Sequence, residues 1–178
     1  MEAEYLQIAS LVEAEFARNK ARFGDRMRCR LGCTDCCHHL FNVDTLEARR
    51  IADYVAELPN QEQEKLSARA RFYQERRSRL EGRRLACAAL TPEGACAIYA
   101  ARPLVCREFG MPIYDPRQPG SLKACELNFQ PGEEIDSDGI VERQTEIHQR
   151  WEALKSHHSD GRRWTVAAAI LRTCDADS

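Results

Sequence analysis

Apolar side chains recur at helical spacing along most of this chain, with polar positions between them. In the first such stretch, Tyr5, Ile8 and Val12 fall on one face. Helices of this kind bury their apolar face against one another. The pattern predicts five helices, which cover about residues 2–23, 44 or 45 to 58, 60–82, 138–158 and 164–173.

Two of these helices carry specific end signals. Gly24 follows the first helix at the position where glycine commonly closes a helix. Asp44 and Glu47 have the spacing of a capping box, in which both side chains bond to free backbone amides of the first turn. Pro59 stops this second helix, because the residue before a proline avoids the helical conformation.

Strand signals are confined to two short pieces, around Leu40–Val43 and Ala97–Tyr99. No strand–helix unit, internal repeat or low-complexity tract recurs along the chain. We therefore expect a mainly α fold with a single small domain over residues 1–178. Its helices would form a frame that holds the loops of residues 29–125.

Length and charge narrow the classes of protein. The chain has 178 residues with 26 basic and 28 acidic side chains, which gives a net charge of -2. This balance gives no electrostatic reason to expect binding to nucleic acid or to an anionic membrane. No stretch reaches the ~18 apolar residues of a membrane span, and no apolar signal segment follows Met1. We therefore expect a cytoplasmic protein that does not enter a membrane.

The composition is unusual in its nine cysteines. An odd number without a secretory signal argues against a disulfide framework, and clustered cysteines then favour metal binding. Cys174 stands alone, and we expect it to be an apolar thiol on the last helix. The other eight are candidate metal ligands: Cys29, Cys33, Cys36, Cys37, Cys87, Cys96, Cys106 and Cys125.

The first cluster reads Cys29-x-x-x-Cys33-x-x-Cys36-Cys37. Thiolates are preferred ligands of zinc and of iron–sulfur clusters, and a short loop delivers several of them with little loss of entropy. Neighbouring side chains diverge in an extended backbone, so we expect Cys36 and Cys37 not to bind one ion together. Either they serve two centres, or one of them binds and the other supports it.

The second cluster contains Cys87, Cys96 and Cys106. The Pro92-Glu-Gly94 segment predicts a turn that brings Cys87 and Cys96 near each other. The Arg102-Pro103 pair suits a helix start, which would place Cys106 one turn inside a short helix.

These two clusters in this order resemble the YkgJ-type cysteine-cluster family, which is named for a Cys-x-x-Cys-x-x-Cys-Cys signature. The resemblance also rests on the segment Cys96-x-Ile-Tyr99-x-x-Arg102-Pro103-x-x-Cys106-Arg107-x-Phe109, and it covers about residues 29–125. It implies a zinc- or iron-chelating domain. The gap between Cys29 and Cys33 is three residues here, whereas the first gap of the signature is two. Cys29 therefore departs from the position of the first cysteine in the family signature. A flagellin lysine methylase carries a similar cluster within a longer chain.

The same gap gives Cys29, Cys33 and Cys36 the spacing by which radical S-adenosylmethionine enzymes hold a [4Fe-4S] cluster. Those enzymes need a large barrel of strand–helix units after the motif. This chain has neither the strand pattern nor the length for such a barrel, so that interpretation is set aside.

Zinc and iron both remain open as the metal. Structural zinc sites usually combine two Cys-x-x-Cys loops, and only Cys33 and Cys36 have that form here. A compact run of cysteines with a distant fourth, for which Cys106 is the candidate, is more typical of an iron–sulfur cluster. Eight cysteines suffice for two four-thiolate centres, or for one centre with several buried thiols. His38 and His39 are expected to be neighbours of the centre rather than ligands.

The hypothesis favoured by these residues is a metal-binding protein that acts as an accessory or metal-handling factor, with a protein partner that the sequence does not identify. The alternative is an iron–sulfur protein with redox or enzymatic activity. A third hypothesis is a disulfide-stabilised protein without metal. No catalytic triad, phosphate loop or paired carboxylate can be singled out, so the sequence leaves enzymatic activity open and favours a protein that is not an enzyme.

Charged runs are interpreted as solvated surface. Seven arginines between residues 69 and 84 could bind phosphate or an acidic partner, but they also fit the exposed side of an amphipathic helix. The acidic residues between 133 and 138 fit an exposed loop and helix start. Arg102 and Arg107 either neutralise a thiolate site or form ordinary ion pairs.

Overall fold

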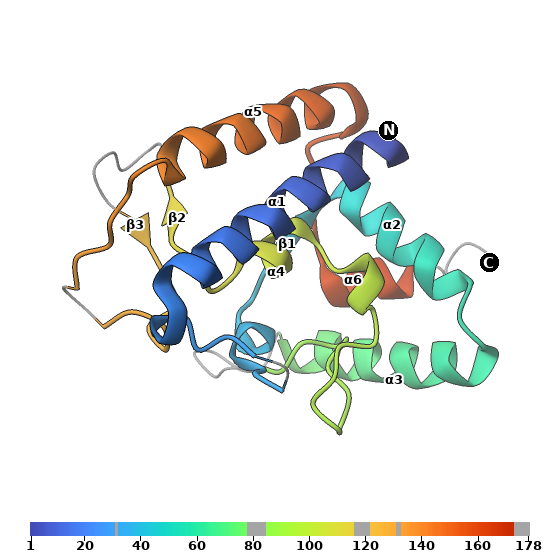
Figure 1. The fold of residues 1–178 in the computed structure, drawn as a ribbon. Helices are drawn as coiled ribbons and strands as arrows, with labels where there is room; N and C mark the ends of the chain where they lie inside the picture. Colours follow the sequence, from blue (N-terminus) through green and yellow to red (C-terminus); the bar gives the residue numbers. More distant parts are fainter. Residues whose placement is uncertain (31, 78–84, 116–121, 131–132, 173–178) are drawn as a thin grey trace. The chain divides into compact units, whose positions relative to one another are not determined.

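The structure is a computed structural model that describes residues 1–30, 32–77, 85–115, 122–130 and 133–172 (Figure 1). Its internal contacts divide the chain into two compact units. Unit 1 consists of Met1–Leu31 and Leu104–His158, and unit 2 consists of Gly32–Pro103 and Ser159–Ser178. Each unit is therefore built from two separate stretches of sequence. The single domain expected over residues 1–178 stays a prediction.

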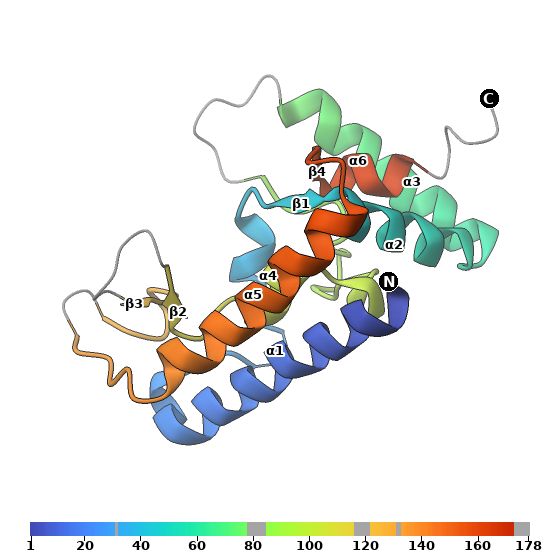
Figure 2. The ribbon, with the colours of Figure 1, turned by 90° about the horizontal axis from the view of Figure 1, so that it is seen from above.

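Unit 1 is built on two long helices. α1 (Glu2–Phe23) and α5 (Ile140–His158) lie side by side and run in opposite directions (Figures 1 and 2). α1 also packs against the short helix α4 (Leu104–Glu108). Next to α5, β2 (Ile113–Tyr114) and β3 (Leu122–Lys123) pair as antiparallel strands.

Unit 2 packs three helices around one apolar core. α2 (Thr45–Ala56) and α3 (Asn60–Arg77) both lie against α6 (Val166–Leu171). β1 (Asn42–Asp44) leads into α2 and β4 (Arg163–Thr165) leads into α6, and the two strands pair as antiparallel neighbours. Fully buried side chains from all three helices form the core, among them Ile51, Val55, Leu66, Ala70 and Ile170.

Side chains fix the start of α2, as the sequence predicts. Asp44 accepts a hydrogen bond from the Leu46 amide at 3.0 Å, and Glu47 accepts one from the Asp44 amide at 3.4 Å. This is the expected capping box. The second carboxylate oxygen of Asp44 accepts from the Ser159 hydroxyl at 2.7 Å, so the cap also ties the two sequence stretches of unit 2 together.

The mainly α fold and the five predicted helices are confirmed, with small shifts at their ends. α5 begins at Ile140 rather than near Asp138, because Gly139 at φ +65° forms a turn before it. The strand predicted around Leu40–Val43 corresponds to β1. Residues 78–82 of the third predicted helix lie outside the described residues. No helix within the described ranges is both long enough and apolar enough to cross a membrane.

The second predicted strand, Ala97–Tyr99, is wrong. Ile98 is buried, but Tyr99 is exposed and begins a 3₁₀ turn, Tyr99–Ala101, so the apolar residues of this segment belong to a turn with one buried side chain rather than to a strand. β2, β3 and β4 were not predicted, because strands of two or three residues show no measurable alternation.

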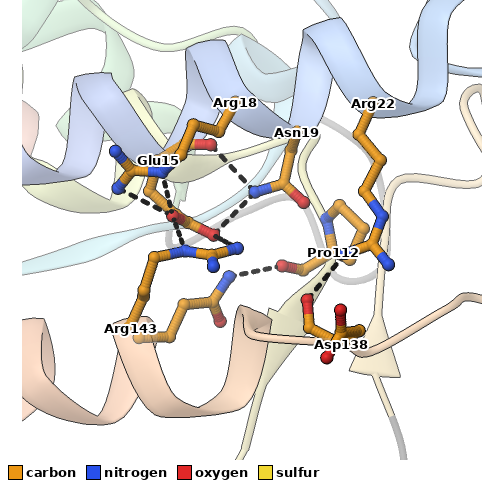
Figure 3. Close-up of polar contacts among 8 residues, drawn as sticks. Glu15, Arg18, Asn19, Arg22, Pro112, Asp138 and Arg143 are labelled. Atoms are coloured by element: carbon orange, nitrogen blue, oxygen red, sulfur yellow. Dashed lines mark hydrogen bonds and ion pairs between the residues drawn. The ribbon is translucent and has the colours of Figure 1, made fainter.

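A buried carboxylate lies on the face of α1 that packs against α5. The side chain of Glu15 is 0% exposed, and it accepts from Arg143 of α5 at 2.7 Å and from Arg18 and Asn19 of α1 at 2.9 Å each (Figure 3). Burial by itself would raise the pKa of Glu15. The hydrogen bonds from Arg143, Arg18 and Asn19 outweigh it and hold that pKa below its usual value.

Glu15→Gln is expected to lower the free energy of unfolding by about 1–2 kcal/mol near neutral pH, because charged hydrogen bonds to two partly exposed arginines become neutral ones. Since the folded pKa of Glu15 is lowered, its contribution is present above the unfolded pKa and is lost as the pH falls through the folded pKa. The difference from the parent in urea unfolding should therefore shrink on acidification. Glu4→Gln, at an exposed position of α1, is the control. A difference that stays constant with pH would contradict this assignment.

Candidate metal centre

The loop that carries Cys36 and Cys37 is a 3₁₀ turn, Asp35–His38. The Cys37 amide closes the turn by donating to the Thr34 carbonyl at 2.9 Å. In this turn the neighbouring side chains stay together, and the Cys36 and Cys37 thiols are hydrogen-bonded to each other. The expected divergence of these two side chains is therefore wrong, because it assumed an extended backbone.

Cys87 and Cys96 flank a tight turn, as the sequence predicts. The Thr91 amide donates to the Ala95 carbonyl at 2.8 Å, and Gly94 takes the left-handed position of the turn at φ +81°. Residues 90 and 96 form an antiparallel bridge across it. The turn therefore returns the chain to the segment that carries Cys87.

One backbone hydrogen bond joins the two cysteine loops of unit 2. The Cys87 amide donates to the Cys37 carbonyl at 2.6 Å. Both Cys36 and Cys37 then lie close enough to Cys87 and Cys96 to interact with them electrostatically. The structure thus brings together four of the predicted ligands, Cys36, Cys37, Cys87 and Cys96, which we call the unit 2 cysteine group.

Burial and hydrogen bonding act against each other at the Cys87 and Cys96 sulfurs. Burial is the larger effect, and it raises the pKa of Cys87 to about 11 and the pKa of Cys96 above its usual value. Backbone amides oppose it: those of Ala89 and Leu90 bond to the Cys87 sulfur, and that of Ile98 bonds to the Cys96 sulfur. A nearby cation is needed to keep these two sulfurs as thiolates at neutral pH.

The pKa values of Cys36 and Cys37 are shifted in opposite directions. The hydrogen bond from the Cys37 thiol lowers the pKa of Cys36 to about 6. The same hydrogen bond, together with burial, raises the pKa of Cys37. One thiolate is therefore stabilised by its neighbour, and an ion bound to both sulfurs would displace the remaining proton.

Cys33, His38 and His39 belong to the same loop. The Cys33 side chain is exposed. His38 Nδ1 lies 3.0 Å from the Thr34 carbonyl oxygen, and His39 Nε2 lies 3.4 Å from a carboxylate oxygen of Asp35. Within the described residues, no three or more Cys, His, Asp or Glu side chains are arranged to hold a metal ion as they stand.

The other three predicted ligands, Cys29, Cys106 and Cys125, belong to unit 1. Cys106 lies within α4, as the Arg102-Pro103 pair predicts. The Cys125 carbonyl accepts the Asn128 amide at 2.8 Å, which closes a turn. The eight described cysteines are all thiols, and Cys174 lies outside the described residues.

Asn128 is a site residue that the sequence analysis did not identify. Its side chain donates a hydrogen bond to the Cys29 sulfur at 3.2 Å, although the two residues are 99 positions apart. No motif links residues so distant in sequence. The only local signal is the position of Asn128 in the turn that begins at Cys125.

The two arginines of the second cluster have different surroundings. The Arg102 guanidinium lies over the Tyr99 ring, 4.1 Å from its centroid. Burial raises the pKa of Cys96, and the charge of Arg102 opposes that rise. Arg107 instead forms an ion pair with Glu13 of α1. Arg102 therefore fits the neutralising role, and Arg107 serves the packing of unit 1.

The two charged runs make contacts within their own units. Arg69 donates to the Ala88 carbonyl at 3.1 Å, beside Cys87. In the acidic run, Glu133 and Asp136 pair with arginines of unit 1. Residues 78–84 of the basic run lie outside the described residues.

Comparison with known protein families identifies the cysteine-bearing region. The family model CxxCxxCC, described as “Putative zinc- or iron-chelating domain”, matches residues 28–128, which is more than half of the chain. This range contains all eight candidate ligands together with Asn128. Neither the curated proteins nor the solved structures give a significant match.

Gly94→Ala is expected to lower the free energy of unfolding by about 1–2 kcal/mol, because a left-handed backbone is strained in any residue with a Cβ atom. The turn between Cys87 and Cys96 should loosen with it, and native-state alkylation of Cys87, followed by mass spectrometry, should become faster. Gly161→Ala is the matched control, since Gly161 also has a positive φ (+75°) in unit 2 but lies outside the turn that joins Cys87 and Cys96. Equal Cys87 reactivity in both variants would contradict the prediction.

Proposed function

This chain belongs to the CxxCxxCC family of zinc- or iron-chelating domains, and from that premise we propose that it binds one of these metals through the unit 2 cysteine group. We propose further that it works as an accessory or metal-handling factor in the cytoplasm, where thiols are kept reduced. The observation that carries the proposal is the hydrogen bond between the Cys87 amide and the Cys37 carbonyl, because it sets two cysteine loops side by side.

The chemistry of the donor set fits both metals. Zinc and iron accept four thiolate ligands, and short loops with several cysteines are the usual source of such ligands. The backbone amides that bond to the Cys87 and Cys96 sulfurs favour the thiolate form that a metal requires. Four thiolates exceed the charge of a divalent ion, and Arg102 beside Cys96 offsets part of that excess.

Each residue of the group has a defined part. Cys36 and Cys37 would be presented by the 3₁₀ turn, and Cys87 and Cys96 by the two sides of the hairpin turn. When bound, the metal supplies a cross-link between these two loops and balances the charge of their thiolates. Three other cysteines of the predicted ligand set, Cys29, Cys106 and Cys125, belong to unit 1 and leave room for a second centre within that unit.

An iron–sulfur cluster with redox activity is the second candidate. Amide hydrogen bonds to sulfur, of the kind received by Cys87 and Cys96, are one of the means by which proteins set the potential of such clusters. They also occur around thiolates that bind zinc. Colour separates the two candidates, because zinc thiolates are colourless and clusters absorb broadly in the visible range.

After anaerobic purification, the protein is expected to contain zinc or iron by elemental analysis, and its visible spectrum identifies the form. Cys36→Ser, Cys87→Ser and Cys96→Ser should each lower the metal-to-protein ratio, because a serine hydroxyl is a much poorer ligand for these ions. Cys174→Ser is the control and should leave the ratio unchanged. A metal-free parent protein, or a ratio that none of the three variants lowers, would rule the proposal out.

Removal of the metal with a chelator is expected to lower the melting temperature by roughly 10 °C, if the metal contributes a few kcal/mol to folding. Without it, the closely spaced thiolates repel one another and the two loops lose their cross-link. Circular dichroism melts before and after chelation measure the effect. The Cys36→Ser/Cys87→Ser double variant is the control, because it lacks two ligands of the unit 2 cysteine group and should respond less to the chelator than the parent. An unchanged melt after verified metal removal would contradict the coupling.

A further inference from the structure

The Cys29 sulfur lies in a seat formed by two other segments of unit 1. The side chain of Asn128 is 6% exposed, and its Nδ2 donates to the Cys29 sulfur at 3.2 Å. Nδ2 also donates to the Gly110 carbonyl at 2.6 Å, and Oδ1 accepts from the Arg28 amide at 2.8 Å. All the polar groups of this buried side chain are therefore in use, and one N–H is directed at sulfur.

Gly110 forms the other wall of the seat. A Cβ atom at this position would overlap the Cys29 sulfur and would lie 3.3 Å from Nδ2 of Asn128. The backbone of Gly110 also has φ +107°, a conformation that residues with a Cβ atom rarely adopt. Glycine is therefore needed here both for the backbone conformation and for the close approach to sulfur.

The two walls come from the segments that carry the other cysteines of unit 1. Asn128 belongs to the turn whose first carbonyl is that of Cys125. Gly110 lies two residues after the end of α4, the helix that contains Cys106. The seat therefore ties together all three segments of unit 1 that hold predicted ligands.

We propose that Asn128 is a positioning residue that holds the Cys29 sulfur as a ligand for a zinc or iron ion in unit 1, separate from the ion proposed at the unit 2 cysteine group, and that Gly110 leaves the space that this sulfur occupies. The inference rests on the proposed metal-binding function and deepens it, because it assigns a role outside the cysteines. An amide N–H bond to sulfur favours the thiolate and fixes the orientation of the side chain, and a neutral amide adds no charge of its own.

A purely structural role for Asn128 would need only its hydrogen bonds to the backbone, and not the one to the Cys29 sulfur. The bonds to the Arg28 amide and the Gly110 carbonyl already join the three segments of the seat. The bond to the Cys29 sulfur adds nothing to that connection that an apolar contact could not supply. Variants must therefore distinguish the bond to sulfur from the bonds to the backbone.

Asn128→Asp keeps the size of the side chain and the acceptor for Arg28, but it replaces the donor to the Cys29 sulfur and to the Gly110 carbonyl with a carboxylate oxygen. Comparison with a background that lacks the Cys29 sulfur then separates the two lost bonds. In the anaerobically purified, metal-loaded Cys36→Ser/Cys87→Ser chain, whose remaining metal lies outside the unit 2 cysteine group, release of the metal to excess chelator should become about 10–100-fold faster, in line with the affinity that is usually lost with a hydrogen-bond partner of a ligand. Native-state alkylation of Cys29 by iodoacetamide, followed by mass spectrometry, should accelerate in parallel. Asn128→Ser replaces it if the aspartate variant does not fold.

A double-variant cycle tests whether Asn128 acts through Cys29. In a Cys29→Ala background, Asn128→Asp should cause no further acceleration of metal release. Asn19→Ala is the matched control, because Asn19 is also a buried asparagine of unit 1 but bonds to Glu15 rather than to sulfur. It should lower the melting temperature and leave both metal release and Cys29 alkylation unchanged.

The outcomes separate the two proposals. A folded Asn128→Asp protein with parental metal release and parental Cys29 protection would overturn the positioning role. Equal acceleration with and without Cys29 would overturn it as well, because the residue would then act by another route. Absence of zinc and iron from the parent protein would overturn the proposed function, and this inference with it.

Discussion

Thiols that are buried together cannot all lose their protons unless positive charge is brought among them, and the arrangement of unit 2 depends on this constraint. Burial favours the protonated thiol at Cys87 and Cys96. Backbone amides favour the thiolate at both residues, and the charge of Arg102 also favours it at Cys96. The two cysteine loops already meet through the bond between Cys87 and Cys37. A metal ion would therefore supply charge balance to an existing arrangement, rather than gather distant segments.

Much of the helical frame could be predicted, because its signals are local. The Asp44 and Glu47 capping box, the glycine after α1 and the turn between Cys87 and Cys96 each depend on residues within ten positions of one another. At this range the identity of a few side chains decides the backbone conformation. The same holds for the assignment of Cys106 to a short helix.

The finer parts of the candidate site could not be predicted, for two physical reasons. The first is backbone conformation: whether Cys36 and Cys37 converge depends on a 3₁₀ turn that the cysteine spacing does not specify. The second is tertiary packing, which alone brings Asn128 to the Cys29 sulfur and Arg143 to the buried Glu15. Periodicity assigns Glu15 to a helix but cannot show that a partner on α5 allows its burial.

The division of each unit into two sequence stretches has a consequence for biosynthesis. During synthesis, α1 leaves the ribosome long before α5, the helix that packs against it. In the same way, α2 and α3 are synthesised long before α6, which lies near the end of the described chain. Contacts between such distant segments form late and slowly. Neither unit can complete its core until its second stretch has been synthesised, so the first cysteine loop leaves the ribosome well before the helices that complete either unit.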